Sequence, residues 1–515
     1  MAARARLAAS VCPGVGGVSV SRAAFAGAAA GALFSLILLV HVAVRTADTR
    51  LDDLGAYRRL WSDQALATTA LVKARTADPA DARNPQSVGT CQRLIVERIN
   101  VLRIRPWQFW RTIRPDPFVR ARIYQMPAPY DDPGRAVLLG SAFRGLGGVA
   151  PYLIFWIAPI LGAPVLGWAI AEMCRGRHTV AAVVFGCLLV ASPFVVEVLA
   201  LSRSPVGFYL VAWLALVALA AFAILGPPPA PGSLMFRCAA AGIVFALCAY
   251  CRIGSLFLTP GVAFVIALGV RRTASRRRML LALGCGILFV APCLALRSQP
   301  SHNRWQPLWE GLGDFDRTHA FTWSDPLAEE WAVRHGAHLW TDEGEAAFRA
   351  DMLAAIRREP FWFVRILAQR LGATITQYKL WPRIATDGLW MRRSTSMNEG
   401  FIDKYYTYTE TVDFLGWGSH LVEVPVTVMI LPTVALLALR RGSELLVLAA
   451  ASATVFVPVL ISTASGQETQ AFALVYFLGI AFAAECAARK AWTVRDRKSE
   501  GQARPRFARG LPGVT

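Results

Sequence analysis

The sequence predicts an all-α integral membrane protein, a polytopic bundle of about ten transmembrane helices with two large outer loops. Hydrophobic residues make up 55% of the 515-residue chain and charged residues only 17%, and the mean hydropathy is +0.42. Many uninterrupted apolar runs are long enough to cross ~30 Å of hydrocarbon. Because backbone polar groups cannot stay unpaired in lipid, these runs are expected to be helices rather than isolated strands.

The apolar runs predict ten spans in the following order: 23–45, 148–172, 179–201, 207–226, 238–251, 254–270, 279–296, 421–439, 444–463 and 469–487. The fifth run is short, so we expect it to pair with the sixth through a turn at Arg252. The first run is longer than the core of a cleaved signal peptide, which favours an uncleaved first span.

Basic residues gather in alternate connectors that contain almost no acid. They are Arg4, Arg6, Arg22, Arg175, Arg177, Arg237, Arg271, Arg272, Arg276, Arg277, Arg278, Arg440, Arg441 and the basic tail 489–515. These connectors carry nearly all of the +20 net charge, and the positive-inside rule predicts that they and both termini are cytoplasmic. Such spreading along a membrane face excludes a nucleic-acid-binding domain and suits contact with anionic headgroups. We expect the chain in a bacterial inner (plasma) membrane.

This layout divides the chain into four regions. They are a membrane region 1–296 with the first outer loop at about 46–146, a second outer loop 297–420, the last spans in 421–488 and the tail 489–515. Loops of this size are where function is expected, because channels and carriers seldom need them. The first loop contains an amphipathic basic stretch, 91–110, that suits a helix in the interface, either as an anchor or as a site for a lipid phosphate.

An acidic pair, Asp52-Asp53, follows the first span by a few residues. Water reaches a carboxylate just beyond the end of a membrane helix, so the pair costs little there. Its depth suits chemistry on a lipid headgroup. A general base must lie within hydrogen-bond reach of the proton that it removes, and Asp53 is our candidate, with Asp52 as the alternate.

The second loop is dense in aromatic, acidic and basic residues. Its candidate sugar-contacting residues are His302, Trp305, Asp314, Asp316 and Asp325. Aromatic faces stack on pyranose rings and carboxylates bind hydroxyls, but the same residues also form ordinary turns and helix caps. Farther on, helical periodicity from Glu345 to Leu371 is interrupted at Pro360, which predicts two helices packed over the bundle.

Cysteine and metal patterns point to no cofactor. Of ten cysteines, only Cys91 lies clearly in an outer loop, so no disulfide framework is expected. Cys248-Ala-Tyr-Cys251 has redox spacing, but it lies in an apolar hairpin without a thioredoxin-like context, which favours small buried residues. Carboxylates and histidines leave a divalent metal conceivable, although no ligand spacing identifies one.

The chain resembles the GT-C superfamily of membrane glycosyltransferases, near the family-39-like protein O-mannosyltransferases and aminoarabinose transferases. Asp52-Asp53-Leu-Gly-Ala-Tyr57 is similar to the family's acidic motif after the first span, with Leu54 where the family has Glu if Asp53 is the catalytic Asp. Met126-Pro-Ala-Pro-Tyr130 is similar to the segment before the second span, and 305–325 is similar to a segment of family-39-like members.

The resemblance implies inverting transfer of a hexose or pentose from a polyprenyl-phosphate donor to an acceptor lipid, glycan or protein at the outer face. It implies substrate contacts by Tyr57 and Tyr130. Arg203 and Arg252, where apolar spans meet water, are candidates for holding the leaving phosphate. Two other classes stay open: a transporter or flippase for envelope lipids or polysaccharides, and a non-catalytic assembly partner. We see no internal repeat of the kind that transporters show.

Overall fold

The computed structural model describes residues 16–48, 150–192, 195, 199, 206–296, 304–313, 321, 325–338, 341–376, 430–461 and 471–503. Within these ranges the chain is all-α and contains no strand. Five helical segments are long and apolar enough to cross a membrane: Gly207–Leu225, Pro231–Cys251, Ile253–Arg272, Arg278–Ala295 and Gly442–Leu460. The predicted all-α class is therefore confirmed for the described residues, and its helices suit a membrane protein.

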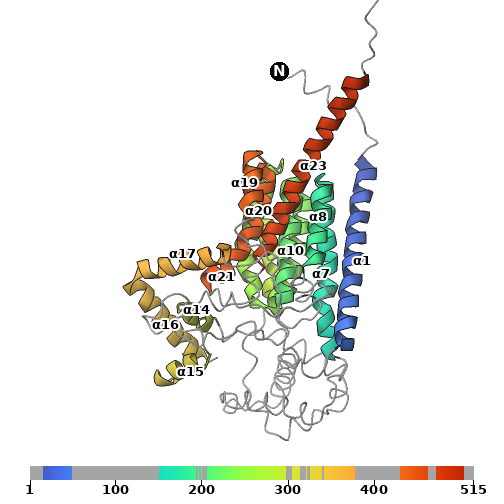
Figure 1. Cartoon of the computed structure of the whole chain (residues 1–515). Helices are drawn as coiled ribbons and strands as arrows, with labels where there is room; N and C mark the ends of the chain where they lie inside the picture. The colour runs from blue at the N-terminus through green and yellow to red at the C-terminus, as the bar shows by residue number, and fades with distance from the viewer. Residues whose placement is uncertain are drawn as a thin grey trace, which may run out of the picture.

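Helices run side by side in an elongated bundle (Figure 1). They are α1 (Gly16–Asp48), α7 (Ala150–Arg175), α8 (Thr179–Ala191), α10 (Val206–Ala220) with the π-helical segment η4 (Ala221–Leu225), α11 (Pro231–Cys251), the 3-10 segment η5 (Ile253–Leu258) with α12 (Thr259–Arg272), α13 (Arg278–Ala295), α19 (Ile430–Ala438), α20 (Gly442–Ala451), the 3-10 segment η8 (Ser452–Val455), α21 (Phe456–Leu460) and α23 (Ala473–Ala503). Each predicted span overlaps one of these helices or a continuous series of them.

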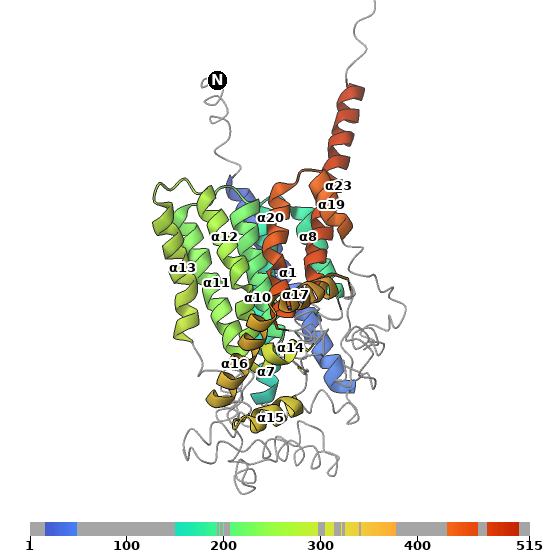
Figure 2. The same ribbon diagram turned by 90° about the vertical axis from the view of Figure 1, so that its left-hand side faces the viewer.

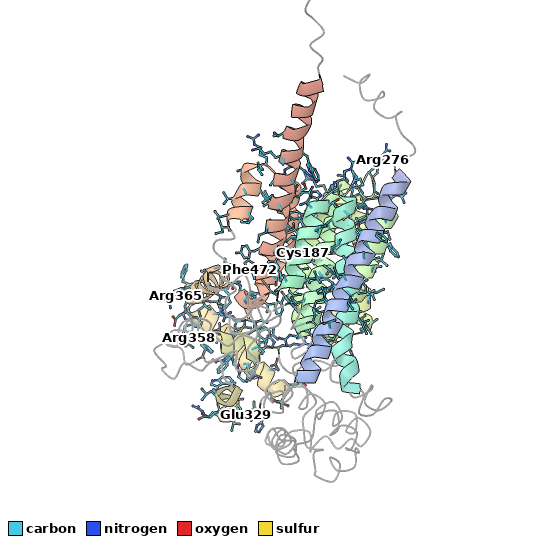
Figure 3. All side chains as sticks on the ribbon, turned by 45° about the vertical axis from the view of Figure 1, so that its right-hand side comes forward. Cys187, Arg276, Glu329, Arg358, Arg365 and Phe472 are labelled. Carbon is cyan, nitrogen blue, oxygen red and sulfur yellow. The ribbon has the colours of Figure 1, made fainter. Side chains whose placement is uncertain are left out.

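The two ends of the bundle differ in chemistry. We call the end where α7 finishes and α8 begins the basic end, because Arg175, Arg177, Arg237, Arg272 and Arg441 lie there. The opposite end, the far end, includes Asp48, Val206, Arg252 and Leu460. Figure 3 shows Arg276 at the basic end, and α23 extends beyond the bundle on that side in Figures 1 and 2.

The central helix is α10. In the segment Gly207–Leu225, 94% of the most apolar 18-residue stretch is buried inside the bundle. Helix α10 packs against α7, α11, α12 and α20. Hydrogen bonds also link it to the segment from α20 to α21. The Tyr209 hydroxyl lies 2.5 Å from Thr454 Oγ1, and Trp213 Nε1 donates to the Ala451 carbonyl at 2.9 Å. Buried Tyr and Trp need such partners. By contrast, α13 is only 17% buried and exposes Met279, Leu280 and Leu283, as a lipid-facing helix does.

Small residues let α1 and α7 cross closely and antiparallel. Gly27 lies against Gly167 and Ala171, whereas Gly31 lies against Ala163. A Cβ added at Gly167 would stand 2.6 Å from the Gly27 carbonyl oxygen, so the backbones touch with no room for a side chain. This is the small-xxx-small packing that membrane helices use in place of a hydrophobic driving force. A shallow groove of about 470 Å³, lined mostly by Gly and Ala, follows this crossing.

The predicted fifth span, 238–251, is shorter than the helix that the structure shows. We assigned Arg237 to a basic connector, but α11 begins at Pro231 and includes it. Proline at the first turn suits a helix start. Arg237 lies within this apolar helix because its charge is paired: its Nε lies 2.7 Å from the buried Glu172 carboxylate of α7. The turn predicted at Arg252 is confirmed: α11 ends at Cys251, and Arg252 has an extended backbone with φ −151° and ψ 102° before η5.

Buried glutamates organise the basic end, although the connectors there contain almost no acid. Glu172 lies 3.1 Å from Arg175 and 2.7 Å from Arg237, and both guanidiniums stack over the Phe222 ring. Glu485 accepts a hydrogen bond from the Ala181 amide. One carboxylate thus pairs with two cations, and it reduces the repulsion between them beside an apolar ring.

Contacts of the buried His178 join the α7–α8 turn to α20 and α23. His178 Nε2 lies 3.3 Å from a Glu444 carboxylate oxygen, and its Nδ1 lies 2.8 Å from the Gly176 carbonyl. The His178 ring packs edge-on against Phe482. The basic end is therefore held together by polar contacts as well as by apolar packing.

We expect Glu172→Gln to destabilise the protein by about 1.5–3 kcal/mol, because a hydrogen bond to a charged group contributes that much to the free energy of unfolding. Arg175 and Arg237 keep 26% and 23% side-chain exposure, so water moderates the loss. The measurement is the melting temperature in detergent, with Glu330→Gln, a 61% exposed surface glutamate, as the control. An unchanged melting temperature for Glu172→Gln would contradict this role.

Four helices lie beside the far end and are called here the peripheral helices. They are α14 (Gln306–Gly311), α15 (Asp325–Arg334), α16 (Asp342–Arg358) and α17 (Pro360–Thr376). The two helices predicted between Glu345 and Leu371, with a break at Pro360, are confirmed as α16 and α17. Thr341 caps α16 by accepting from the Gly344 amide at 3.0 Å. Helix α17 contacts α21 of the bundle.

Candidate functional site

The sequence-predicted site residues divide according to the part of the chain that the structure describes. Those outside the described residues are Asp52, Asp53, Tyr57, Tyr130, Arg203, His302, Asp314 and Asp316. Asp325 is the first residue of α15, and its side chain is also outside the description. Arg252 and Trp305 are described, and both lie at the far end or in the helices beside it. The candidate site is therefore built around this end.

Arg252 lies between α11 and η5, half-exposed. Its amide donates to the Cys248 carbonyl at 2.7 Å, and its own carbonyl accepts from the Ser255 amide at 3.0 Å. These bonds fix the backbone where an apolar helix ends. An arginine at such a place can keep its stem in apolar surroundings and its guanidinium in water. Segment η5 also contacts α21, which brings this turn into the same layer as the peripheral helices.

Trp305 caps the start of α14 and is half-buried. Its amide and that of Arg304 both donate to Glu345 Oε2 at 2.8 Å, so a carboxylate from α16 satisfies the exposed amides at the start of α14. The Arg349 guanidinium lies 5.4 Å from the Trp305 ring centre. The structure thus gives Trp305 a defined place, with its ring packed on the apolar core of the peripheral helices.

Trp309 is the centre of that apolar core. Its ring contacts Phe321, Trp331 and Phe348 with centroid distances of 5.3, 5.0 and 5.1 Å. Its Nε1 donates to Asp351 Oδ2 at 2.8 Å. Much of the aromatic density that suggested a sugar site therefore builds a core that holds the peripheral helices together. These helices form a folded unit rather than an extended loop.

A fully buried arginine attaches this unit to the bundle. Arg370 of α17 has 0% exposure, and its Nη1 donates to the carbonyls of Val459 and Leu460 at 3.1 Å each. Its Nη2 donates to the Gly311 carbonyl. Carbonyls at the carboxyl ends of helices have no partner within the helix and carry the negative end of the helix dipole. One guanidinium thus joins the carboxyl ends of α21 and α14, as only a planar fork of donors can.

A buried carboxylate belongs to the same junction. Glu310 is 2% exposed and precedes Gly311, whose carbonyl Arg370 binds. Gln306, also 2% exposed, donates from Nε2 to Glu310 Oε1 at 2.9 Å. Burying a charged group is costly unless it is paired or hydrogen-bonded, so such groups are enriched where a protein uses them. Glu310, Gln306 and Arg370 form what we call the polar junction.

The sequence analysis missed Glu310 and Arg370. Glu310 lies within the aromatic segment that we singled out, but it stands in the short helix α14, directly after Trp309, rather than in a loop. Arg370 occupies the buried position of α17, four residues after Ile366, which itself follows Trp362 by four. An arginine in phase with the buried residues of an amphipathic helix is the signal that would have found it.

Metal and thiol chemistry find no support in the described part of the chain. No three His, Cys, Asp or Glu side chains gather there as a metal site needs. Cys248 and Cys251 are both buried. At the far end, the half-exposed Arg252 is a described side chain of the kind that binds anionic groups. Compared with known families, curated proteins and solved structures, the chain matches none of them.

Proposed function

We propose that this chain is a membrane glycosyltransferase that moves a sugar from a polyprenyl-phosphate-linked donor to an acceptor at the outer face. The observation that carries the proposal is that described helices end or begin at the far end next in sequence to candidate residues, and that Arg252 lies at this end. Helix α1 runs antiparallel to α7 and ends there at Asp48, four residues before Asp52. Helix α10 begins there at Val206, three residues after Arg203, and Arg252 and the polar junction lie at the same end.

The proposal includes ten spans with both termini in the cytoplasm. The described helices alternate in direction between the two ends at each of the ten predicted places, which supports this number. The arginines of the basic end support a cytoplasmic assignment for that end. The far end is then outside, where an acceptor lipid, glycan or protein can meet a donor whose lipid tail stays in the membrane.

The proposed chemistry is a displacement at the anomeric carbon. A carboxylate of Asp53, or Asp52, takes the proton of the acceptor hydroxyl as its oxygen forms the new glycosidic bond. The bond from the anomeric carbon to the phosphate oxygen breaks with inversion, and the electron pair stays on the lipid phosphate. Arg203 and Arg252 stabilise this phosphate, because guanidinium binds its oxygens in a bidentate way. Tyr57, Tyr130, His302, Trp305, Asp314, Asp316 and Asp325 are the proposed sugar and acceptor contacts.

We expect the variant of the true base, Asp53→Asn or else Asp52→Asn, to lower transfer by roughly 10²–10⁴-fold, the usual contribution of a general base. The measurement is mass spectrometry of envelope glycans and polyprenyl-phosphate sugars in cells that lack the protein and are complemented by each variant. Wild type and the matched control Glu330→Gln should restore one glycan, whereas the base variant should leave its lipid-linked donor to accumulate.

Full rescue by both aspartate variants would contradict the assigned base. The transporter and assembly-partner alternatives are separated by reconstitution. Purified wild type in vesicles with a lipid-linked sugar should yield a new glycoside if it is a transferase. Movement of the intact donor across the bilayer without a glycoside would indicate a flippase, and neither activity, with glycan loss in cells, would indicate an assembly partner.

A further inference from the structure

Helix α17 has two faces of different character. Its buried face consists of Trp362, Ile366, Arg370 and Thr374, one residue per turn. The opposite face is apolar and open: Phe361 is 87% exposed, Val364 59% and Leu371 41%. These three residues share an arc with Ala368, whereas Arg365 and Gln369 lie at one edge of it. Such a face on a helix is unfavourable in water and favourable at a lipid boundary.

The attachment of α17 sets its depth in the membrane. Arg370 binds the carbonyls of Val459 and Leu460, the last residues of the apolar segment Gly442–Leu460 that is long enough to span a bilayer. The end of a membrane span lies at the boundary between hydrocarbon and headgroups. Helix α17 therefore lies at that boundary and not far out in water.

The orientation of α17 agrees with this depth. In Figures 1 and 2 the helix runs across the direction of the bundle helices. Helices α14, α15 and α16 lie on the side of α17 that is farther from the middle of the bundle. Its buried face packs with these helices through Trp362 and Ile366. The open apolar face is thus turned away from the peripheral helices.

Cations accompany the open face. Arg357 and Arg358 are exposed at the end of α16, directly before α17, and Arg365 is exposed on α17 itself. Figure 3 shows Arg358 and Arg365 together on the peripheral helices, at the side away from the bundle. A helix with apolar residues on one face and arginines at its edge is typical of helices in the plane of a membrane interface.

We infer that α17 is an in-plane interfacial helix. Phe361, Val364 and Leu371 insert into the acyl boundary of the bilayer that the bundle crosses, and Arg357, Arg358 and Arg365 bind the phosphates of that leaflet. Helix α17 holds the peripheral helices and the polar junction at headgroup depth. It is attached to the bundle through Arg370 and to the bilayer through its open apolar face. This inference does not depend on the proposed sugar transfer.

The test is lipid photocrosslinking of the full chain in nanodiscs of mixed zwitterionic and anionic phospholipid. Benzoylphenylalanine is incorporated in place of Phe361 or, separately, Leu371. Phe236, 70% exposed on α11, is the aromatic lipid-facing control, and Val333, 49% exposed on α15, is the control for an exposed apolar residue away from the bilayer. Mass spectrometry then identifies adducts on phospholipid acyl chains.

We expect lipid adducts at Phe361 and Leu371 in yields comparable to Phe236 and at least about tenfold above Val333. Adducts no more frequent than at Val333 would overturn the inference. Adducts only to protein, either a second copy or another chain, would also overturn it, because the open face would then be a protein interface. The use of two positions guards against local misfolding at one of them.

Discussion

Replacing Arg370 by methionine is expected to release the peripheral helices from the bundle. The side chain has 0% exposure and donates to carbonyls of Gly311, Val459 and Leu460. Methionine fills much of the same volume but leaves these carbonyls without their donor. Leaving a buried acceptor without its donor costs about 1–3 kcal/mol for each group. We expect a lower melting temperature and faster proteolysis within 304–376.

Two variants sharpen this test. Arg370→Lys keeps the charge but presents a single ammonium, which cannot bind carbonyls from two helices as a guanidinium fork does, so we expect an intermediate loss. Arg334→Met removes a 66% exposed arginine from α15 and should leave the melting temperature unchanged. Equal stability of wild type and Arg370→Met would show that α17 is attached by apolar contacts alone.

A leucine at Gly27 is expected to separate α1 from α7. The ideal Cβ at this position meets the Gly167 carbonyl closer than real contacts allow, and it lies 2.8 Å from the Ala171 Cβ. Overpacking a close crossing costs about 1–3 kcal/mol and occasionally more, and here the obstacle is backbone, which cannot rotate away. We expect a loss of about 3 kcal/mol, measured as the melting temperature in detergent.

The chain offers a matched control for this change. Gly286 lies in the apolar helix α13, and a Cβ there meets nothing within 4 Å, so Gly286→Leu should be tolerated. Because α1 ends at Asp48 just before the acidic pair, the proposed function adds a second expectation: Gly27→Leu lowers sugar transfer as well. A melting temperature equal to that of Gly286→Leu would contradict the close crossing.

The features predicted well from the sequence are local ones. Apolar runs, the turn at Arg252 and the break at Pro360 depend on residues next to one another in the chain. The helix start at Pro231 was missed because Arg237 resembles a connector residue when its partner is unknown. That partner, Glu172, lies 65 residues away in sequence, and only the packing of both α7 and α11 against α10 brings the two together.

The candidate site shows the same division. The helical membrane class, the order of the apolar helices and the clustering of arginines in alternate connectors follow from the sequence alone, because hydrocarbon selects for length and apolarity. The core position of Trp309, the burial of Glu310 and Arg370 and the open apolar face of α17 became known from the packed structure. Burial depends on contacts between distant segments: the helical phase of Arg370 indicates that it is buried, but not which carbonyls it binds.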